Sequence, residues 1–221
     1  MSSILTVLTD ETDPTTPSIE PQRGQILEQA RVQFLRRGYS AFTMDDLAAR
    51  LGMSKKTLYV HFRSKEAIIR TVIDGFAAEI RRDAERLLAD QALDFAEKLR
   101  GFSLGLMERL ARISPLVLRD LQRSAPALYR HVEQLRGKNI PYIFGRFVEE
   151  GQVVGVVRDD VSPVFAGEFY LHAMQGMMLP ATLLRLNIRP ETAADGALRI
   201  FFGGLLTPAG HKQYEKSFPP A

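Results

Sequence analysis

Hydrophobic residues recur three and four positions apart along most of this 221-residue sequence, and runs of alternating polar and apolar residues are few. This spacing predicts amphipathic helices. The first of them carries Ile26, Ala30, Phe34 and Leu35 on one face and is expected to end at Gly38. The pattern as a whole therefore predicts an all-α fold.

Residues that cap helices divide the next fifty positions into three segments. Thr43 precedes the first segment, two acidic residues follow in its first turn, and Gly52 is placed to end the helix. Ser54 is expected to cap the next helix, and Ser64 the one after it. The last of these helices is predicted to be long and to reach about residue 88.

The remainder of the chain is expected to form five more helices, at residues 95–110, 116–135, 142–148, 164–186 and 193–206. Proline or glycine interrupts the pattern near residues 114–115, 125–126, 151–163, 189–190 and 207–208. Residues 152–157 could instead form a short strand. No internal repeat or sustained heptad pattern is present, which disfavours a solenoid and an extended coiled coil.

Positive charge is concentrated in one part of the chain, although the net charge is only +3. Residues 1–20 contain four acidic residues and no basic one, whereas residues 21–72 contain ten Lys or Arg and four acidic residues. A basic segment beside a nearly neutral remainder is typical of a protein in which one domain faces a polyanion. A solvated basic surface without a partner is the alternative.

The composition excludes several classes of site. Hydrophobic residues make up 45% of the chain and charged residues 25%, as in a folded globular protein. Cysteine is absent, and the four histidines lack the spacing of a zinc motif, so neither a metal site nor a cofactor is expected. No export signal and no run of 18 apolar residues is seen, and we expect a cytoplasmic protein without a membrane partner.

The segment from Thr43 to Phe62 has the pattern of a helix-turn-helix. Ala48 is small where two helices would cross, and Gly52 lies where a tight turn requires a positive φ. Leu58 and Phe62 are expected in the core, so the opposite side of the third helix offers charge, hydroxyl groups and an aromatic ring to a DNA duplex. A short helix pair with a solvated lysine face is the alternative interpretation.

Three stretches of this segment resemble the N-terminal domain of TetR-family transcriptional regulators: residues 43–48 (TMDDLA), 51–59 (LGMSKKTLY) and 61–67 (HFRSKEA). The resemblance covers about residues 23–72, and the rest of the chain is similar to the family only in length and helical character. The resemblance implies that the following residues lie on or beside a recognition helix: Ser54, Lys55, Lys56, Thr57, Tyr59 and His61. It also implies phosphate contacts by Thr43 and Lys65, which lie at helix starts, where free backbone N–H groups favour a phosphate.

The same resemblance suggests how the chain is divided. We expect a flexible acidic tail at residues 1–20 and a helix-turn-helix DNA-binding domain at residues 21–66. A helical effector-binding and dimerisation domain is expected at residues 67–210, followed by a C-terminal tail at residues 211–221.

In the family, the last two long helices pair with their mates in a four-helix dimer interface, which corresponds here to about residues 163–187 and 191–206. These stretches contain more apolar residues than one small body needs for its own core. The residues expected at the interface are Phe165, Phe169, Met178, Leu198, Phe201 and Leu205. An entirely intramolecular core is the alternative.

The family also encloses an effector pocket between the DNA-binding domain and that interface. Flexible methionine and aromatic side chains suit an apolar or amphipathic ligand. The residues expected to line the pocket are Phe102, Met107, Tyr142, Phe147, Tyr170, His172, Met174 and Met177. Methionine and aromatic residues at helical spacing also fit an ordinary core, and the sequence does not identify the ligand.

Taken together, the resemblance implies a sequence-specific regulator that binds palindromic double-stranded operator DNA as a homodimer. Repression relieved by a small-molecule effector is the expected mode of action. A ligand-dependent activator and a sequence-independent DNA-binding protein are the alternatives. An enzyme is not expected, because the chain contains no nucleophile-elbow, phosphate-loop or dinucleotide-binding motif.

Overall fold

The computed structural model describes residues 19–114 and 116–217, and within these ranges it contains α-helices and no β-strand. The helices are α1 (Ile19–Arg37), α2 (Met44–Leu51), α3 (Lys55–His61), α4 (Lys65–Ala89), α5 (Phe95–Ala111), α6 (Leu116–Ser124), α7 (Pro126–Val153), α8 (Pro163–Met177), α9 (Pro180–Leu186), α10 (Pro190–Leu205) and α11 (Pro208–Ser217). The predicted all-α fold is confirmed. The acidic tail predicted at residues 1–20 lies outside the described residues, except for its last two positions, which begin α1.

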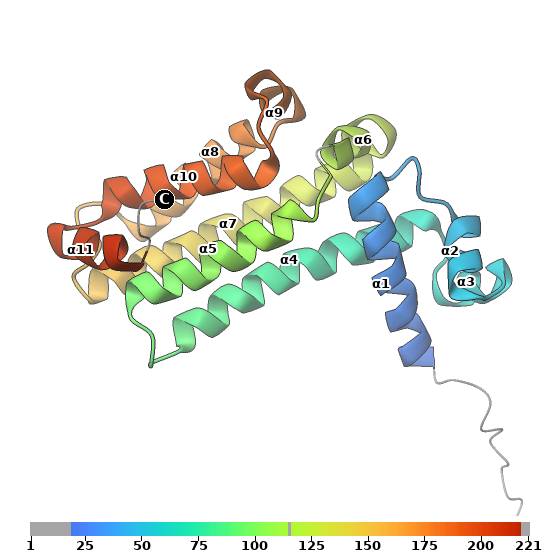
Figure 1. Ribbon diagram of the computed structural model, residues 1–221, viewed down its shortest axis with the longest axis horizontal. Helices are drawn as coiled ribbons and strands as arrows, with labels where there is room; N and C mark the ends of the chain where they lie inside the picture. Colours follow the sequence, from blue (N-terminus) through green and yellow to red (C-terminus); the bar gives the residue numbers. More distant parts are fainter. Residues whose placement is uncertain (1–18, 115, 218–221) are drawn as a thin grey trace, which may run out of the picture.

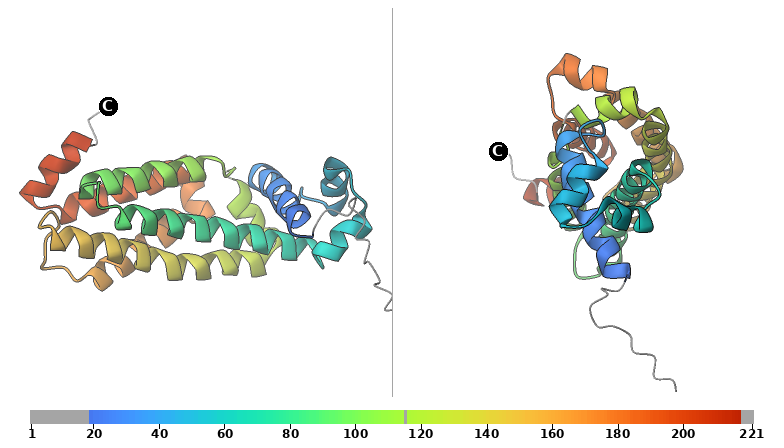
Figure 2. Two further views of the ribbon diagram at one scale, coloured as in Figure 1. Left: turned by 90° about the horizontal axis from the view of Figure 1, so that it is seen from below. Right: turned by 90° about the vertical axis from the view of Figure 1, so that its right-hand side faces the viewer.

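The helices form an elongated bundle with a small group of helices at one end (Figure 1). Helices α4, α5 and α7 run along its length, α8 and α10 pack beside them, and α2 and α3 lie at one end. Figure 2 shows α11 at the opposite end of the long axis. We call α1–α3 the head and α4–α11 the body.

Helices α2, α3 and α4 begin where the capping residues predict. Thr43, Ser54 and Ser64 each accept a hydrogen bond from the backbone N–H group three residues later, at 3.0–3.1 Å. These contacts satisfy N–H groups that have no partner within the helix. Gly52 ends α2 with a φ of 63°, a left-handed conformation that glycine adopts without a Cβ penalty.

A first hydrophobic core fills the head and continues into the body. Ile26, Leu47 and Leu58, one from each head helix, are completely buried in it. The same cluster contains Val117 of α6 and Leu128 of α7, which belong to the body. Apolar packing is therefore continuous across residue 66, where we expected a domain boundary. That division stays a prediction.

A second core fills the body and is rich in aromatic side chains. The Phe102 and Phe147 ring centroids lie 5.2 Å apart, and those of Phe144 and Tyr170 lie 3.8 Å apart. Phe202 of α10 also contacts Phe144 and Phe147. Burying each such side chain stabilises the fold by roughly 1.5–3 kcal/mol, so this cluster fixes the arrangement of α5, α7, α8 and α10.

Some predicted helix boundaries in the body are wrong. Residues 126–153 form one helix through Pro141, although the pattern suggested that a separate helix begins at residue 142. Buried residues continue along one face of α7 beyond the proline, at Ile143, Phe144, Phe147 and Val148. Their packing outweighs the backbone hydrogen bond that a proline cannot donate. Conversely, the helices predicted at residues 116–135 and 164–186 are each divided at a proline, Pro126 and Pro180.

Residues 152–157 do not form the short strand that we considered. The first two of them complete α7, and Val157 makes only an isolated antiparallel bridge with Leu206. Helix α11 occupies most of the segment predicted to be a C-terminal tail, whose residues 218–221 lie outside the described part of the chain.

Candidate DNA-binding surface and ligand cavity

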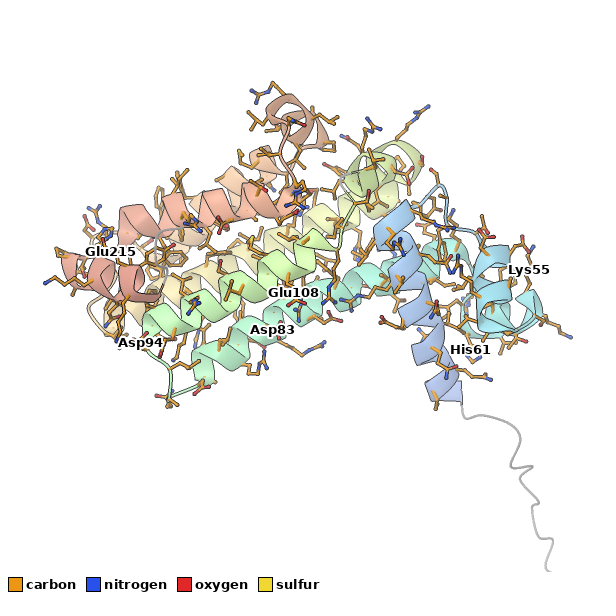
Figure 3. All side chains as sticks on the ribbon, viewed as in Figure 1. Lys55, His61, Asp83, Asp94, Glu108 and Glu215 are labelled. Atoms are coloured by element: carbon orange, nitrogen blue, oxygen red, sulfur yellow. The ribbon has the colours of Figure 1, made fainter. Side chains whose placement is uncertain are left out.

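Helix α3 presents one buried face to the head and one exposed face to solvent. Leu58 is completely buried and Phe62, which ends the helix, is 3% exposed. Lys55, Lys56 and Tyr59 are exposed, as the sequence predicted. Figure 3 shows Lys55 at the outer end of the molecule. A short helix with this polarity can enter a DNA major groove with its exposed side chains toward the bases.

The predicted hydroxyl contacts lie on the same outer surface. Thr43 and Ser54 are exposed, and both use a hydroxyl lone pair to cap a helix. The Thr57 hydroxyl lies 2.9 Å from that of Ser54 and is partly buried. Val60, which the helix-turn-helix pattern does not single out, is also strongly exposed on α3. Its signal was its position two residues after Leu58, on the opposite side of the helix.

An ion pair connects the two helices of the helix-turn-helix. The Lys55 ammonium lies 2.6 Å from the Asp45 carboxylate of α2. The hydrogen bond to Asp45 raises the Lys55 pKa above its ordinary value. Lys55 is therefore fully charged at neutral pH, and a phosphate or a base would compete with Asp45 for it.

His61 does not lie on the exposed face where we expected it. Its Nε2 lies 3.1 Å from Gln22 Oε1, and its backbone oxygen accepts a hydrogen bond from Arg23 Nη1 at 2.9 Å. The Arg23 guanidinium also stacks 4.1 Å from the centroid of the Phe62 ring. Figure 3 shows His61 beside α1. His61 is thus a helix–helix contact at the last residue of α3, beside the start of α1, and packing at a helix end is the alternative to the DNA contact that the resemblance implies for it. Its DNA contact stays a prediction.

Lys65 lies at the start of α4, beside the loop that joins α1 to α2. Its ammonium is 4.1 Å from the centroid of the Tyr39 ring and 6.0 Å from that of Phe42. Burial lowers the Lys65 pKa, while the charge of Asp120 acts in the opposite direction. Sequence reasoning missed Tyr39, whose ring holds this lysine in place through a cation–π contact. The phosphate contact of Lys65 stays a prediction.

An apolar cavity of about 180 Å³ lies between the head and the body. Three of the residues predicted to line a pocket do line it, namely Phe102, Tyr170 and Met174. The cavity also has walls that we did not anticipate, from the head residues Phe34 and Leu35 and from helices α4 and α6. These residues resemble ordinary core in the sequence, because apolar spacing does not distinguish a packed face from the wall of a void.

The other five predicted pocket residues do not line this cavity. Phe147 is completely buried in the body core, and Met107 and Met177 pack against that core. Tyr142 is exposed and donates a hydrogen bond to Glu85 at 3.0 Å, and His172 is exposed beside Gln175. The physical reason is helix rotation: Tyr142 precedes the inward-facing Ile143 and Phe144, and so lies on the outer side of α7.

Four of the six predicted interface residues are part of the chain's own core. They are Met178, Leu198, Phe201 and Leu205, none of which is more than 8% exposed. These assignments are wrong, because a side chain enclosed by its own chain offers no surface to a partner. Phe165 and Phe169 are 63% and 56% exposed on α8. Ile200 is one of the apolar residues that the sequence offers in these two stretches, and Val164 is one that sequence reasoning missed. They are 79% and 76% exposed, on α10 and α8 respectively.

The pattern of the bacterial regulatory proteins of the tetR family matches residues 26–72, which include the helix-turn-helix just described. Residues 26–72 therefore form a DNA-binding domain of the TetR-family type. This makes the protein a DNA-binding transcriptional regulator and not an enzyme. The relatives include the HTH-type transcriptional repressor DhaR of Mycobacterium sp. (strain GP1), which is 28% identical over 84% of this chain and 93% of that protein. The HTH-type transcriptional regulator UidR of Escherichia coli (strain K12) is 24% identical over 85% of this chain and 94% of that protein.

Solved structures of TetR-family and other transcriptional regulators share the fold. A transcriptional regulator from Cytophaga hutchinsonii aligns with a TM-score of 0.65 at 18% identity, over 84% of this chain and 99% of that one. A putative TetR-family regulator from Mesorhizobium loti aligns with a TM-score of 0.60 at 17% identity, over 86% and 100%. At these identities the likeness concerns the fold alone. Among the described residues, no helix has the length and apolar character needed to cross a membrane.

Proposed function

We propose that this protein is a homodimeric TetR-family repressor that a small apolar molecule releases from a palindromic operator in the cytoplasm. The observation that carries the proposal is the apolar cavity whose wall is built by both head and body, from Phe34 of α1 to Tyr170 of α8. A molecule in that cavity would contact α1 of the head and α8 of the body, the helix that also carries the proposed dimer surface.

The exposed face of α3 supports the DNA-binding part of the proposal. This helix has only seven residues, so it reaches few base pairs. Selective binding by such a unit is normally achieved by two copies whose half-sites lie about 34–36 Å apart. Lys55, Lys56 and Tyr59 supply the groups that would contact the groove.

The outward side of α8 and α10 supports the dimer. Val164, Phe165, Phe169 and Ile200 expose apolar side chains on these two helices, and the ring centroids of Phe165 and Phe169 lie 6.4 Å apart. Exposed apolar patches on a soluble protein often mark an interface. These two helices also contain glycines, each of which lowers helix stability by about 1 kcal/mol relative to alanine. At four of them, a Cβ added to the glycine would have no other atom of the described chain within 4 Å. These are Gly176, Gly196, Gly203 and Gly204. Packing within the described chain therefore does not require glycine at these positions. Close approach of a second copy would explain why glycine is present there.

Ligand-induced release follows from the shared wall if the ligand binds two arrangements of head and body unequally. Helix α6 is the element between them, because Val117, Leu118 and Leu121 line the cavity while the adjoining Ser114 N–H donates to Leu35 O at 2.8 Å. A ligand that favours a different spacing of α6 and α1 would tilt the head and change the distance between the two recognition helices.

Fluorescence anisotropy of the purified protein tests this function. A labelled duplex from the region upstream of the protein's own gene is titrated with the protein, with a random duplex of equal length as competitor. We expect the protein to prefer the operator duplex over the random duplex by at least about a thousandfold. We also expect neutral apolar compounds from a screening panel to lower its affinity for the operator duplex. Lys56→Ala should weaken binding, and Lys212→Ala on the distant α11 should not.

Two results would contradict separate parts of the proposal. Equal affinity for operator and random duplexes would favour a sequence-independent DNA-binding protein. Specific binding that no cavity-filling compound weakens would remove ligand-induced release and leave a regulator of another kind.

A further inference from the structure

The cavity wall contains very few polar side chains. Among the described residues that line it, Arg136, Asn139 and Tyr170 are the ones with hydrogen-bonding groups. Arg136 Nη1 donates to Glu133 Oε1 at 2.6 Å, and Asn139 Nδ2 donates to Ala77 O at 3.1 Å. The Tyr170 hydroxyl is buried and has no hydrogen-bond partner in the described part of the chain. Of these three residues, Tyr170 is the one whose polar atom is buried without any partner, so a ligand would be the hydrogen-bond partner that it lacks.

The position of Tyr170 is fixed by aromatic packing. Its ring centroid lies 3.8 Å from that of Phe144 on α7 and 4.9 Å from that of Phe201 on α10. Met174 lies one turn further along α8, and it also lines the cavity. Because its ring is confined between two helices, the tyrosine side chain has little freedom to seek a partner elsewhere.

The surroundings also keep this hydroxyl in its neutral form. Burial raises the Tyr170 pKa well above its ordinary value, and the charge of Asp195 adds to the effect. The Asp195 carboxylate itself accepts a hydrogen bond from Arg199 Nε at 2.8 Å. A protonated phenol can donate one hydrogen bond, and a buried hydroxyl left without a partner is unfavourable. The group that fits here is a hydrogen-bond acceptor.

Size and charge narrow the ligand further. A dry apolar cavity of about 150 Å³ binds benzene, so one of about 180 Å³ suits a molecule only slightly larger. The one charged side chain in the described wall, Arg136, already pairs with the Glu133 carboxylate. Transfer of a charged ligand from water into this apolar cavity would therefore cost free energy.

We propose that the effector is a compact neutral molecule, mostly hydrocarbon, with one acceptor oxygen such as a carbonyl, and that the Tyr170 hydroxyl is the specificity-determining group that binds this oxygen. The inference rests on the proposed function only in taking this cavity as the effector site.

Three probes of nearly equal shape test the inference. Acetophenone carries a carbonyl, cumene replaces its oxygen with a methyl group, and benzoate adds a negative charge. Their dissociation constants are measured by isothermal titration calorimetry with wild-type protein and with Tyr170→Phe, which keeps the ring and its packing. Tyr142→Phe, on the outer side of α7, is the matched control. Thermal melting verifies that each variant is folded.

The inference expects acetophenone and cumene to bind the wild-type protein and benzoate to bind at least tenfold more weakly. Tyr170→Phe should weaken acetophenone binding by about threefold to tenfold, the range for one hydrogen bond, and should leave cumene unchanged or bound more tightly. Tyr142→Phe should alter neither. Equal changes for the two neutral probes in Tyr170→Phe, tight binding of benzoate, or no binding of either neutral probe would each overturn the inference.

The same samples separate this inference from the proposed function. If acetophenone binds through Tyr170 but leaves operator affinity unchanged in the anisotropy assay, the ligand class stands and release from DNA is refuted. If operator binding is specific and dimeric but neither neutral probe binds, the ligand class is refuted and the DNA-binding function stands.

Discussion

Ser40 and Asp120 join the loop between α1 and α2 to helix α6. The Ser40 backbone N–H donates to Asp120 Oδ2 at 2.8 Å, and the Ser40 hydroxyl donates to Asp120 Oδ1. The hydroxyl oxygen of Ser124, one turn further along α6, lies 2.9 Å from the Ser40 hydroxyl oxygen. The head is therefore attached to the body by a charged hydrogen-bonded contact beside the cavity, as well as by apolar packing.

Asp120→Ala should destabilise the protein by about 1–2 kcal/mol at pH 7, because hydrogen bonds to a carboxylate are lost. Burial alone would raise the Asp120 pKa, but the hydrogen bonds from Ser40 and Ser124 hold it below its usual value. The carboxylate thus contributes stability above its ordinary pKa, and this contribution is lost as the pH falls through the lowered pKa. Urea denaturation measures the free energy of unfolding of the wild type and of Asp120→Ala. The difference between these two values should become smaller as the pH is lowered from 7 to 3.

The exposed Asp159 is the control for that comparison, and Asp159→Ala should leave the free energy of unfolding within about 0.5 kcal/mol of wild type. A difference between Asp120→Ala and wild type that stayed constant down to pH 3 would show that the charge of Asp120 does not stabilise the fold.

The salt dependence of operator binding should report the lysines that neutralise phosphates. Lys65→Ala should reduce the slope of log affinity against log salt by about one unit if Lys65 contacts a phosphate from its place above Tyr39. Lys212→Ala, on α11 at the far end of the body, should leave the slope unchanged. Anisotropy titrations between about 50 and 200 mM salt measure both. An unchanged slope for Lys65→Ala would limit this residue to packing against Tyr39.

Base recognition is tested on the exposed face of α3. Lys55→Ala should weaken binding to the operator by about 1–3 kcal/mol and random duplex by less, if Lys55 contacts a base edge. The variant also frees Asp45, which loses its 2.6 Å partner. Asp45→Asn controls for that loss, since it removes the ion pair and keeps the lysine. Equal losses on operator and random duplexes would assign Lys55 to the phosphates.

The dimer should depend on the exposed aromatic residues of α8. Phe169→Glu introduces a charge into the proposed apolar interface and should convert the dimer to a monomer in sedimentation velocity, with loss of operator binding. Leu104→Glu, at a residue 58% exposed on α5, is the matched control and should stay dimeric. Leu198→Ala should instead lower the free energy of unfolding by about 2–5 kcal/mol, because Leu198 is completely buried in the body core. A dimeric Phe169→Glu protein would refute the proposed interface.

A buried ion pair should be important for the stability of the body. Lys98 Nζ lies 2.6 Å from Glu150 Oε1 and donates to Leu88 O at 3.0 Å, so it joins α4, α5 and α7. Glu150→Ala leaves the nearly buried ammonium without its counter-ion and should destabilise the protein by about 3–5 kcal/mol. Replacing both partners with Met and Leu should cost less, since no charge is then left unpaired. Urea denaturation distinguishes the two variants, and equal losses would contradict this account.

Local chemistry explains which features could be predicted from the sequence. The helix ends at Thr43, Gly52 and Ser54 depend on contacts within a few residues, and all three are present in the structure. The exposed and buried sides of α3 follow from a single helical period. These features require no knowledge of distant packing partners.

The features that escaped prediction depend on contacts between distant segments. Pro141 lies within α7 because packing against α8, where a Cβ at Gly167 would come within 2.6 Å of Pro141 O, holds the helix together. The sequence contains no local sign of this contact. The rotation of each body helix is also set by its neighbours, so the sequence pattern predicts Tyr142 and His172 in the pocket although both face outward.

Phe34 and Leu35 have two roles, since they belong to the hydrophobic core of the head and also line the cavity. A substitution there that adapts the cavity to a new molecule also alters the helix that supports DNA recognition. Changes in Phe102 or Met174, which pack in the body core, carry no such penalty. Divergence in chemical sensitivity should therefore accumulate on the α5 and α8 walls, while the α1 wall is kept constant by the requirement to bind an operator.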